Sequence, residues 1–262
     1  MKISIITPTL NHARFIEDTI LSVKNQDYKD FEHIVIDGGS DDGTIDILRK
    51  YPHLIWISEK DSGQSNAINK GFKMAKGDII TWLNSDDYFE NNIFSRIVKL
   101  FEDNKDCFVL YGNMTDIGEN KNILGTRTGD TITLKHLLIN PDIVRQPGCF
   151  WRREVINRIG NLNEDLHLVM DYDYFLRIAK QFKFYHVNIN LCYFRLFQGT
   201  KTSRLPKRQL QEIYWVMRKE SSWIPFRFYL FLFNRKYFSM KQKLFNVIKR
   251  LIRISWHLQI LL

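Results

Sequence analysis

Short apolar runs alternate with helical patterns along the first hundred residues of the chain. Runs rich in β-branched residues predict strands at 2–7, 31–37, 55–58 and 79–83. Apolar residues at helical spacing predict helices at 14–25, 44–50, 65–75 and 91–104. Because this strand–helix–strand order repeats with short loops, we expect an α/β fold whose parallel, doubly wound sheet is covered by helices on both faces.

The pattern changes after residue 107. It predicts a strand at 108–112, edge strands within 113–150, helices at 134–139 and 169–182, and late strands at 184–187 and 191–194. The apolar runs of this half are too scattered for an independent core. We therefore expect residues 113–200 to extend the first sheet and to form a second lobe over it.

Composition narrows the class of protein. A chain of 262 residues with 44% hydrophobic and 26% charged residues is neither disordered nor fibrous. Its three cysteines have no C-x-x-C spacing, which disfavours a disulfide framework and a zinc site and fits a reducing compartment. The first residues enter a strand at once and lack the pattern of a secretory signal, so we expect a cytoplasmic protein.

The net charge of +9 is unevenly distributed. Residues 1–200 contain 24 Lys and Arg against 27 Asp and Glu, whereas residues 201–262 contain 14 against 2. This asymmetry predicts a mildly acidic domain at 1–200 and a basic tail at 201–262. An anionic surface is the expected partner of the tail alone.

Polar residues follow each of the four predicted strands, where ligands bind to an open parallel sheet. These loops are TPTLN at 7–11, DGGSDDG at 37–43, EKDSG at 59–63 and NSDD at 84–87. Turn formation and helix capping explain any single loop equally well. They do not explain Asp86 and Asp87, because adjacent carboxylates at a buried sheet edge repel each other unless a cation or polar ligand compensates. A divalent cation with phosphate oxygens suits this pair, so the expected ligand is a diphosphate.

Missing motifs restrict the kind of diphosphate compound. No G-x-G-x-x-G and no G-x-x-x-x-G-K-[ST] follows the first strand, which disfavours dinucleotide oxidoreductases and P-loop hydrolases. A sugar nucleotidyltransferase would carry a Gly-rich loop with a basic residue there, and TLNH at 9–12 does not supply one.

Six segments carry a resemblance to a known family. They are ITPTLN (6–11), IDGGSDDGT (36–44), SEKDSGQSNAINKG (58–71), GDIITWLNSDD (77–87), QPGCFWRREV (146–155) and MDYDYFLRIA (170–179). In order and spacing they resemble the family 2 inverting glycosyltransferases of the GT-A fold, which build bacterial lipopolysaccharide, capsule and other surface glycans. Over about residues 2–200 the resemblance implies a Rossmann-like, mostly parallel sheet. Together with the charge asymmetry, it divides the chain into a nucleotide-sugar half at 1–112, an acceptor half at 113–200 and a helical tail at 201–262.

The resemblance implies a nucleotide site at the first three strand ends. Asp37 would hydrogen-bond the base of a nucleoside-diphosphate sugar. Thr7 and Pro8 would line the base pocket, and Asp61 would face the ribose.

It also implies a metal and a catalytic base. Asp87 would ligate Mn²⁺ or Mg²⁺, with Asp86 near the ribose or a metal-bound water, and the cation would neutralise the departing diphosphate. Asp171 occupies the position of the family's base, which takes the proton from an acceptor hydroxyl. Without the resemblance, Asp171 and Asp173 would equally well stabilise a helix N-terminus.

Three residues depart from the family pattern. Gly38 stands where a second acidic residue often follows Asp37, and Asn66 stands where many members have Asp. Phe197 stands at the position of a His, so Arg195 or Lys201 would have to supply positive charge.

The basic tail predicts a helix at 205–220 and an amphipathic helix at 242–262. Its longest apolar run, 228–233, falls far short of the ~20 residues that a spanning helix needs. Aromatic residues beside basic ones at 223–262 indicate an element lying on an anionic membrane. Packing of these helices on the catalytic lobe is the alternative, and no module for nucleic acid is present.

The predicted function is metal-dependent, inverting transfer of a sugar from a nucleoside-diphosphate sugar, a UDP-sugar, to a hydroxyl. The acceptor would be a glycan or lipid-linked glycan, with the enzyme peripheral on the inner face of the cell membrane. Two alternatives are a nucleotide-sugar-binding module without catalysis and a sugar nucleotidyltransferase.

Overall fold

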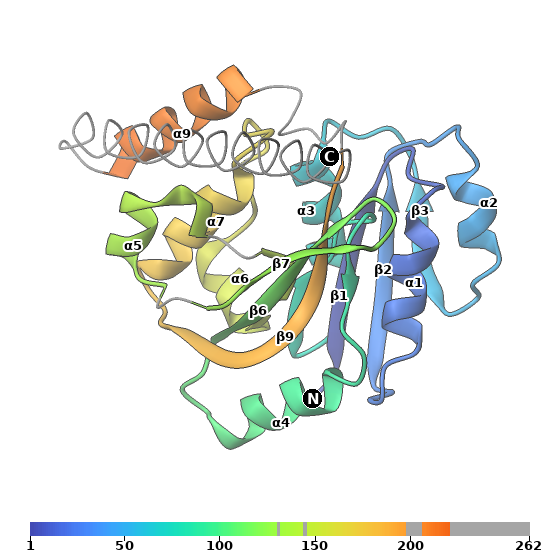
Figure 1. The fold of residues 1–262 in the computed structure, drawn as a ribbon, viewed down its shortest axis with the longest axis horizontal. Coiled ribbons are helices and arrows are strands. Elements are labelled where there is room, and N and C mark those ends of the chain that lie inside the picture. Colours follow the sequence, from blue (N-terminus) through green and yellow to red (C-terminus); the bar gives the residue numbers. More distant parts are fainter. Residues whose placement is uncertain (130–131, 144–145, 198–205, 221–262) are drawn as a thin grey trace, which may run out of the picture.

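A computed structural model describes residues 1–129, 132–143, 146–197 and 206–220 of the chain (Figure 1). Within them a nine-stranded sheet has the order β3-β2-β1-β4-β8-β6-β9-β5, and β7 pairs with β6. The strands are β1 (Ile3–Thr9), β2 (Phe31–Asp37), β3 (Leu54–Ser58), β4 (Ile79–Trp82), β5 (Tyr88–Phe89), β6 (Val109–Gly118), β7 (Ile123–Arg127), β8 (Cys149–Arg152) and β9 (Phe184–Leu196). The helices are α1 (Ile16–Lys24), α2 (Thr44–Arg49), α3 (Gln64–Met74), α4 (Phe94–Asp103), α5 (Leu134–Ile139), α6 (Arg153–Ile159), α7 (Met170–Ala179) and α9 (Pro206–Glu220).

The first half confirms the predicted α/β order. Strands β3, β2, β1 and β4 pair in parallel, with α1, α2 and α3 in the connections between them. All seven residues of β1 are buried, as expected of a central strand covered on both faces.

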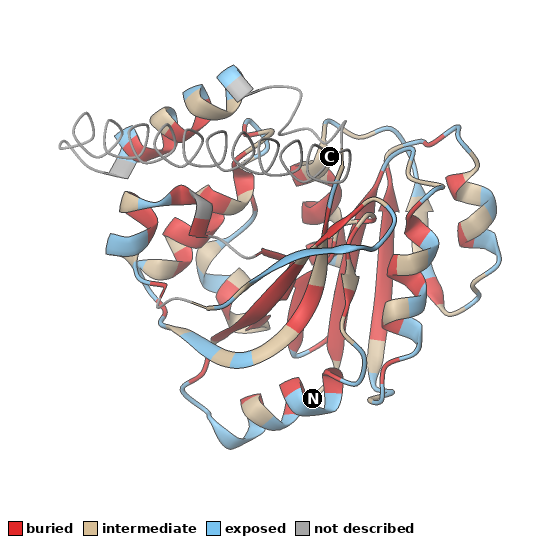
Figure 2. Cartoon of the chain, in the orientation of Figure 1, coloured by how far each residue is buried: buried red, intermediate tan, exposed pale blue. Residues whose placement is uncertain are grey.

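Alternate residues of β1 pack into different layers. Ile3 and Ile5 join a core cluster with Phe94 and Ile97 of α4, whereas Ile6 joins a cluster with Phe72 of α3. The second cluster extends to buried side chains of α7, so helices cover both faces of the sheet. Buried positions concentrate in these central strands, and exposed positions lie on the outer faces of the helices and along β7 (Figure 2).

The second half extends the same sheet with mixed pairing. β8 is antiparallel to β4 and β6, β9 is parallel to β6, and β5 is antiparallel to β9. The expected extension of the sheet is therefore present, and its pairing is mixed.

One long strand, β9, replaces the two late strands that the apolar pattern predicts. Its register against β6 shifts at Gly112, Asn113 and Met114, and these irregularities accommodate the polar residues between the apolar runs. Asn188 accepts a hydrogen bond from Asn113 at 3.0 Å, and Asn190 accepts one from Thr115 at 2.9 Å. Side-chain pairing across the two strands thus lets β9 continue through a polar stretch.

The helix predicted at 205–220 is present as α9. Its buried side chains Ile213, Val216 and Met217 belong to the core cluster that contains the α7 residues. No helix of the described ranges is long and apolar enough to cross a bilayer. Residues 223–262, predicted to lie on a membrane, are outside the described part of the chain.

A buried histidine on β2 gives the fold a sensitivity to acid. His33 has no exposed surface, and its Nε2 lies 2.9 Å from the Thr7 hydroxyl oxygen. Burial, reinforced by the nearby His53, lowers the pKa of His33 from 6.5 to about 3. The folded protein therefore keeps this ring neutral where the unfolded chain would protonate it.

We expect the free energy of unfolding to fall as the pH is lowered through the window between these two pKa values. In that window the unfolded state binds more protons than the folded state, so stability rises with pH and is lost on acidification. Between pH 7 and pH 5 the loss from His33 is about 2 kcal/mol. Urea unfolding of His33→Gln should show a pH dependence smaller by that amount. The exposed His136→Gln is the matched control, and equal pH dependence in His33→Gln and wild type would contradict the assignment.

Candidate active site

The carboxyl ends of the first three strands lie side by side. Thr9 of β1 pairs with Asp37 of β2, and Asp37 pairs with Ser58 of β3. The loops that follow are bound to one another, since the Asn11 backbone N–H donates to the Ser40 hydroxyl at 2.7 Å. The polar strand ends found in the sequence therefore meet at one edge of the sheet.

Asp37 is completely buried within its own turn. Its Oδ2 accepts hydrogen bonds from the backbone N–H groups of Gly39 and Ser40, at 3.0 and 2.9 Å, and from the Ser58 hydroxyl at 2.6 Å. Its Oδ1 accepts one from the Ser40 hydroxyl. These contacts hold the loop after β2 in place and leave the carboxylate no surface toward solvent.

Thr7 and Pro8 are also interior residues. Both are buried in β1, and the Thr7 hydroxyl faces His33. They stand two residues and one residue before Thr9, the last residue of β1.

Asp61 occupies space that the absence of a side chain at Gly38 leaves open. A Cβ at position 38 would lie 2.8 Å from Asp61 Oδ2 and 3.4 Å from the exposed Leu10. The other oxygen of Asp61 accepts a hydrogen bond from the Gly63 backbone N–H at 2.9 Å. The half-buried carboxylate of Asp61 thus lies where a side chain at position 38 would begin.

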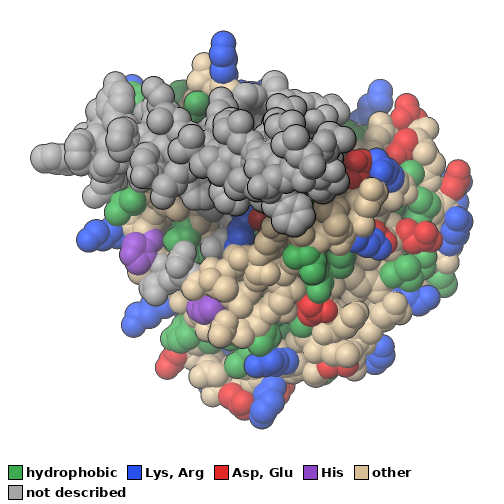
Figure 3. Space-filling view, viewed as in Figure 1, with side chains coloured by type: hydrophobic (Ala, Val, Ile, Leu, Met, Phe, Trp, Pro, Cys, Tyr) green, Lys and Arg blue, Asp and Glu red, His purple; other side chains and the backbone are tan. Residues whose placement is uncertain are grey.

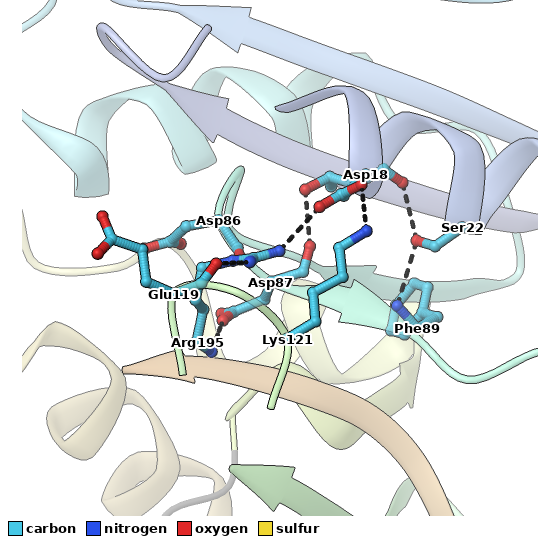
Figure 4. Close-up of polar contacts among 9 residues, drawn as sticks. Asp18, Ser22, Asp86, Asp87, Phe89, Glu119, Lys121 and Arg195 are labelled. Carbon is cyan, nitrogen blue, oxygen red and sulfur yellow. Dashed lines mark hydrogen bonds and ion pairs between the residues drawn. The ribbon is translucent and has the colours of Figure 1, made fainter. Parts of the chain in front are cut away.

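The turn between β4 and β5 brings Asp86 and Asp87 to the same edge of the sheet (Figure 4). Asp87 is fully buried: one oxygen accepts the Arg195 backbone N–H at 2.9 Å and the other faces the Asn84 amide at 3.3 Å. Asp86 is only partly buried. Burial raises the pKa of both carboxyls, and for Asp87 the neighbouring Asp86 raises it further.

Arg195, near the end of β9, lies against this turn with 2% of its surface exposed. Its Nε donates to the backbone oxygen of Asp86 at 2.9 Å, and its Nη1 donates to that of Glu119 at 2.8 Å. Its Nη2 forms an ion pair with Asp18 of α1 at 2.9 Å. A single side chain therefore joins β9, α1, the β6–β7 turn and the paired aspartates.

Aromatic rings cover the Arg195 guanidinium. It lies 4.7 Å from the centroid of the Phe15 ring and 5.8 Å from that of Tyr88. Phe197, which stands at the family's His position, packs on Phe15 with 5.0 Å between ring centroids. Of the two cations that the sequence offers for this place, Arg195 is at the site and Lys201 lies outside the described ranges.

Asp171 and Asp173 lie in the first turn of α7 and differ in their contacts. Asp173 forms an ion pair with Arg177 at 3.0 Å, and Arg177 also donates to the backbone oxygens of Ile159 and Asn161. Asp171 is half-buried and accepts the backbone N–H of Tyr172 at 2.8 Å. Asp173 thus has a structural role within its own lobe.

Two sets of hydrogen bonds that connect α3 to this site could not be predicted from the apolar pattern or the motifs. Gln64, the first residue of α3, donates to Asn84 at 2.8 Å and so connects α3 to the Asp87 turn. Asn66 and Asn69 of α3 donate to Glu164 at 2.9 and 2.8 Å, across almost a hundred residues of sequence. Only the polar character of a helix that follows a strand end could have indicated such contacts.

Few of the described side chains lie together as possible ligands of a metal ion. Among the residues that the structure describes, no three His, Cys, Asp or Glu side chains converge in a group that could hold a metal ion. One or two carboxylates with water and phosphate oxygens are a sufficient set for Mg²⁺ or Mn²⁺ beside a diphosphate. The two desolvated carboxyls of the β4–β5 turn fit that description.

Comparison with known proteins decides the family. Residues 4–160 match the family described as glycosyl transferase family 2. The chain belongs to this family. Family membership confirms the resemblance drawn from the motifs and makes the chain a glycosyltransferase.

Curated relatives match this glycosyltransferase over about two thirds or more of its length. The chondroitin synthase of Escherichia coli is 27% identical over 205 residues, which cover 77% of this chain but only 30% of the relative. The PGL/p-HBAD biosynthesis glycosyltransferase of Mycobacterium bovis is 31% identical over 180 residues, covering 66% of this chain and 68% of the relative.

Solved structures confirm the GT-A fold of the glycosyltransferase. S. aureus TarS 1–349 in complex with UDP-GlcNAc superposes with a TM-score of 0.67 at 21% identity, over 88% of this chain and 70% of that one. The mannosyltransferase PcManGT of Pyrobaculum calidifontis, in complex with GDP-Man and Mn²⁺, gives 0.63 at 18% identity, over 90% and 69%.

Proposed function

We propose that this glycosyltransferase uses a divalent metal to transfer a sugar from a UDP-sugar to a hydroxyl of a glycan or lipid-linked glycan, with inversion. The observation that carries the proposal is the Asp86–Asp87 turn, where two desolvated carboxyls lie at the strand ends beside one buried guanidinium. The UDP-GlcNAc and UDP complexes of TarS, and the GDP-Man and Mn²⁺ complex of PcManGT, support a nucleotide sugar and a metal.

Burial divides the two aspartates between two roles in this proposal. Asp86, the partly exposed carboxylate, binds the cation, which when bound neutralises negative charge on the departing diphosphate. Asp87 orients the turn, because both its oxygens face donors inside the protein. Arg195 holds the Asp86 backbone and keeps positive charge beside the site.

In this proposal, the nucleoside part of the donor binds at the neighbouring loops, which follow β2 and β3. Asp61 presents its carboxylate beside Gly38 and contacts the nucleoside, while Asp37 keeps the loop after β2 in shape through its buried hydrogen bonds. Thr7 and Pro8 support this loop from β1.

Asp171 is the catalytic base of the proposal. It accepts the proton of the acceptor hydroxyl while that oxygen attacks the anomeric carbon from the face opposite the diphosphate. Its neighbour Asp173 forms an ion pair with Arg177 within the same helix.

The metal role is tested by comparing two isosteric variants. We expect Asp86→Asn to weaken binding of UDP with Mn²⁺ by about tenfold or more, since it removes a charged ligand. Asp87→Asn should weaken the binding of UDP with Mn²⁺ by a smaller factor, because its amide oxygen can still accept the Arg195 backbone N–H. Isothermal titration calorimetry with UDP and MnCl₂ measures both, and a larger loss in Asp87→Asn would return the ligand role to Asp87.

The base is tested by Asp171→Asn. Turnover should fall by about 10³-fold, the scale of general-base catalysis, while the affinity for UDP with Mn²⁺ stays unchanged. The measurement is UDP release from the UDP-sugar that gives the largest thermal stabilisation in the presence of Mn²⁺. Asp173→Asn is the matched control, expected to lower the melting temperature and to keep turnover.

The same assay separates the alternatives. Retained turnover in Asp171→Asn would contradict the base assignment. Binding without any turnover in the wild type would indicate a nucleotide-sugar-binding module, and release of pyrophosphate in place of UDP would indicate a nucleotidyltransferase.

Association with the inner face of an anionic membrane, through residues 223–262, is the second part of the proposal. Helix α9, which precedes this segment, supports it with an exposed face that carries Lys207, Gln211, Trp215, Arg218 and Lys219. Trp215 is 65% exposed, and the Lys219 ammonium lies 5.7 Å from its ring centroid. An exposed Trp among basic residues suits the headgroup region of a membrane. The surface around α1 and α2 differs from this basic face of α9. There, Figure 3 shows acidic and basic side chains interspersed.

Neutralising the basic face of α9 should weaken membrane binding. Replacing Lys207, Arg218 and Lys219 together by Ala is expected to lower affinity for phosphatidylglycerol vesicles by about 100-fold, at roughly 1 kcal/mol for each charge. Co-sedimentation of the full chain measures this, with phosphatidylcholine vesicles and Lys50→Ala, an exposed residue directly after α2, as controls. If the triple variant bound the vesicles as the wild type does, α9 would not be part of the surface that contacts the membrane.

A further inference from the structure

The segment 162–168 leads directly into the helix that presents Asp171. It lies between α6, which ends at Ile159, and Val169, the residue before α7, and no side chain caps the N-terminus of α7 at Val169. The start of α7 is therefore connected to the rest of the chain through the contacts of this segment as well as through the buried side chains of the helix itself.

On one side, the segment is bound to α3. Asn69 exchanges two hydrogen bonds with the Leu162 backbone, at 2.9 and 3.0 Å, and Glu164 accepts from the amides of Asn66 and Asn69. The Ser65 hydroxyl donates to the backbone oxygen of Leu166 at 3.1 Å. Because α3 begins at Gln64, which binds Asn84 of the aspartate turn, these contacts join the segment to the donor side of the site.

On the other side, the segment is bound to α9 by one carboxylate. Glu212 Oε2 accepts the backbone N–H groups of His167 at 3.1 Å and Leu168 at 2.8 Å. Its Oε1 accepts the Nε–H of Arg208 at 2.9 Å, and the residue is 9% exposed. Glu212 is thus a desolvated, fully engaged acceptor for two consecutive backbone groups, which stand four and three residues before Asp171.

We propose that Glu212 is a positioning residue for the glycosyl transfer reaction: through the backbone of His167 and Leu168, helix α9 sets the place of the Asp171 carboxylate. The inference rests on the proposed role of Asp171. It makes α9, which also carries the basic face assigned above to the membrane, part of the catalytic lobe. A small displacement of a base relative to its substrate is enough to lower a rate by about 100-fold.

Three variants of α9 test the inference in the full chain. Glu212→Leu removes the acceptor, and Glu212→Gln keeps an oxygen that can accept both N–H groups. Val216→Ala removes buried packing from the same helix without removing a hydrogen bond to the segment, so it controls for a general loss of stability. The probes are UDP release from the UDP-sugar selected by thermal stabilisation, calorimetry with UDP and MnCl₂, and hydrogen exchange of peptides covering 165–170.

We expect Glu212→Leu to lower kcat by about 100-fold, with the KM for the UDP-sugar and the Kd for UDP within about twofold of wild type. The backbone amides of His167 and Leu168 should exchange faster. Glu212→Gln should stay within about threefold of the wild-type kcat, and Val216→Ala should lose stability with little change in kcat.

The opposite results would overturn the inference. Equal losses of kcat in Glu212→Leu and Val216→Ala, or a loss of UDP affinity that matches the loss of kcat, would reduce Glu212 to a structural residue. A fully active Glu212→Leu beside an inactive Asp171→Asn would refute the positioning role alone. Absence of turnover in the wild type, or full activity of Asp171→Asn, would instead refute the proposed function on which the inference rests.

Discussion

A buried guanidinium organises the end of the sheet where the reaction is proposed to occur. Arg195 binds the backbone of Asp86, the backbone of Glu119 and the carboxylate of Asp18, under the ring of Phe15. A charge in this position requires partners on every side, because an uncompensated buried ion destabilises a fold by several kcal/mol. Two aspartates lie beside this one guanidinium, and burial raises the pKa of both, which disfavours their charged forms. A divalent cation bound there, and through it a diphosphate, would stabilise the two carboxylates in their charged form.

Burial separates the acidic residues at the strand ends into two groups with different chemistry. In each of two neighbourhoods, one carboxylate is fully buried with both oxygens facing donors of the protein itself, and a second one is half-buried at the edge. A carboxylate whose oxygens all accept internal hydrogen bonds shapes a turn, and ligand binding would require breaking those bonds. A half-buried carboxylate loses less on meeting a ligand. The fully buried members are Asp37 and Asp87, and the half-buried members are Asp61 and Asp86.

The apolar pattern was sufficient for the first half of the fold because β1 is buried on both faces and each following strand returns parallel to it. It failed where pairing depends on register, as in β9, whose continuity rests on bulges and on Asn188 and Asn190. The motifs located the aspartates, but adjacent residues in a sequence do not reveal which one faces inward. That difference between Asp86 and Asp87 follows from the Arg195 backbone N–H, which a distant strand supplies.

The change in charge near residue 201 does not coincide with the end of the packed core. Lys and Arg dominate from residue 201 onward, where the only acidic residues are Glu212 and Glu220. Glu212 is turned inward, toward the backbone before α7, on the side of α9 that also buries Ile213 and Met217 in the main core. The solvent face of α9 is basic partly because this acidic side chain is withdrawn from it. If the same helix meets an anionic surface, that contact lies one side chain away from the segment that presents Asp171, so membrane docking and placement of the catalytic base would share a single rigid element.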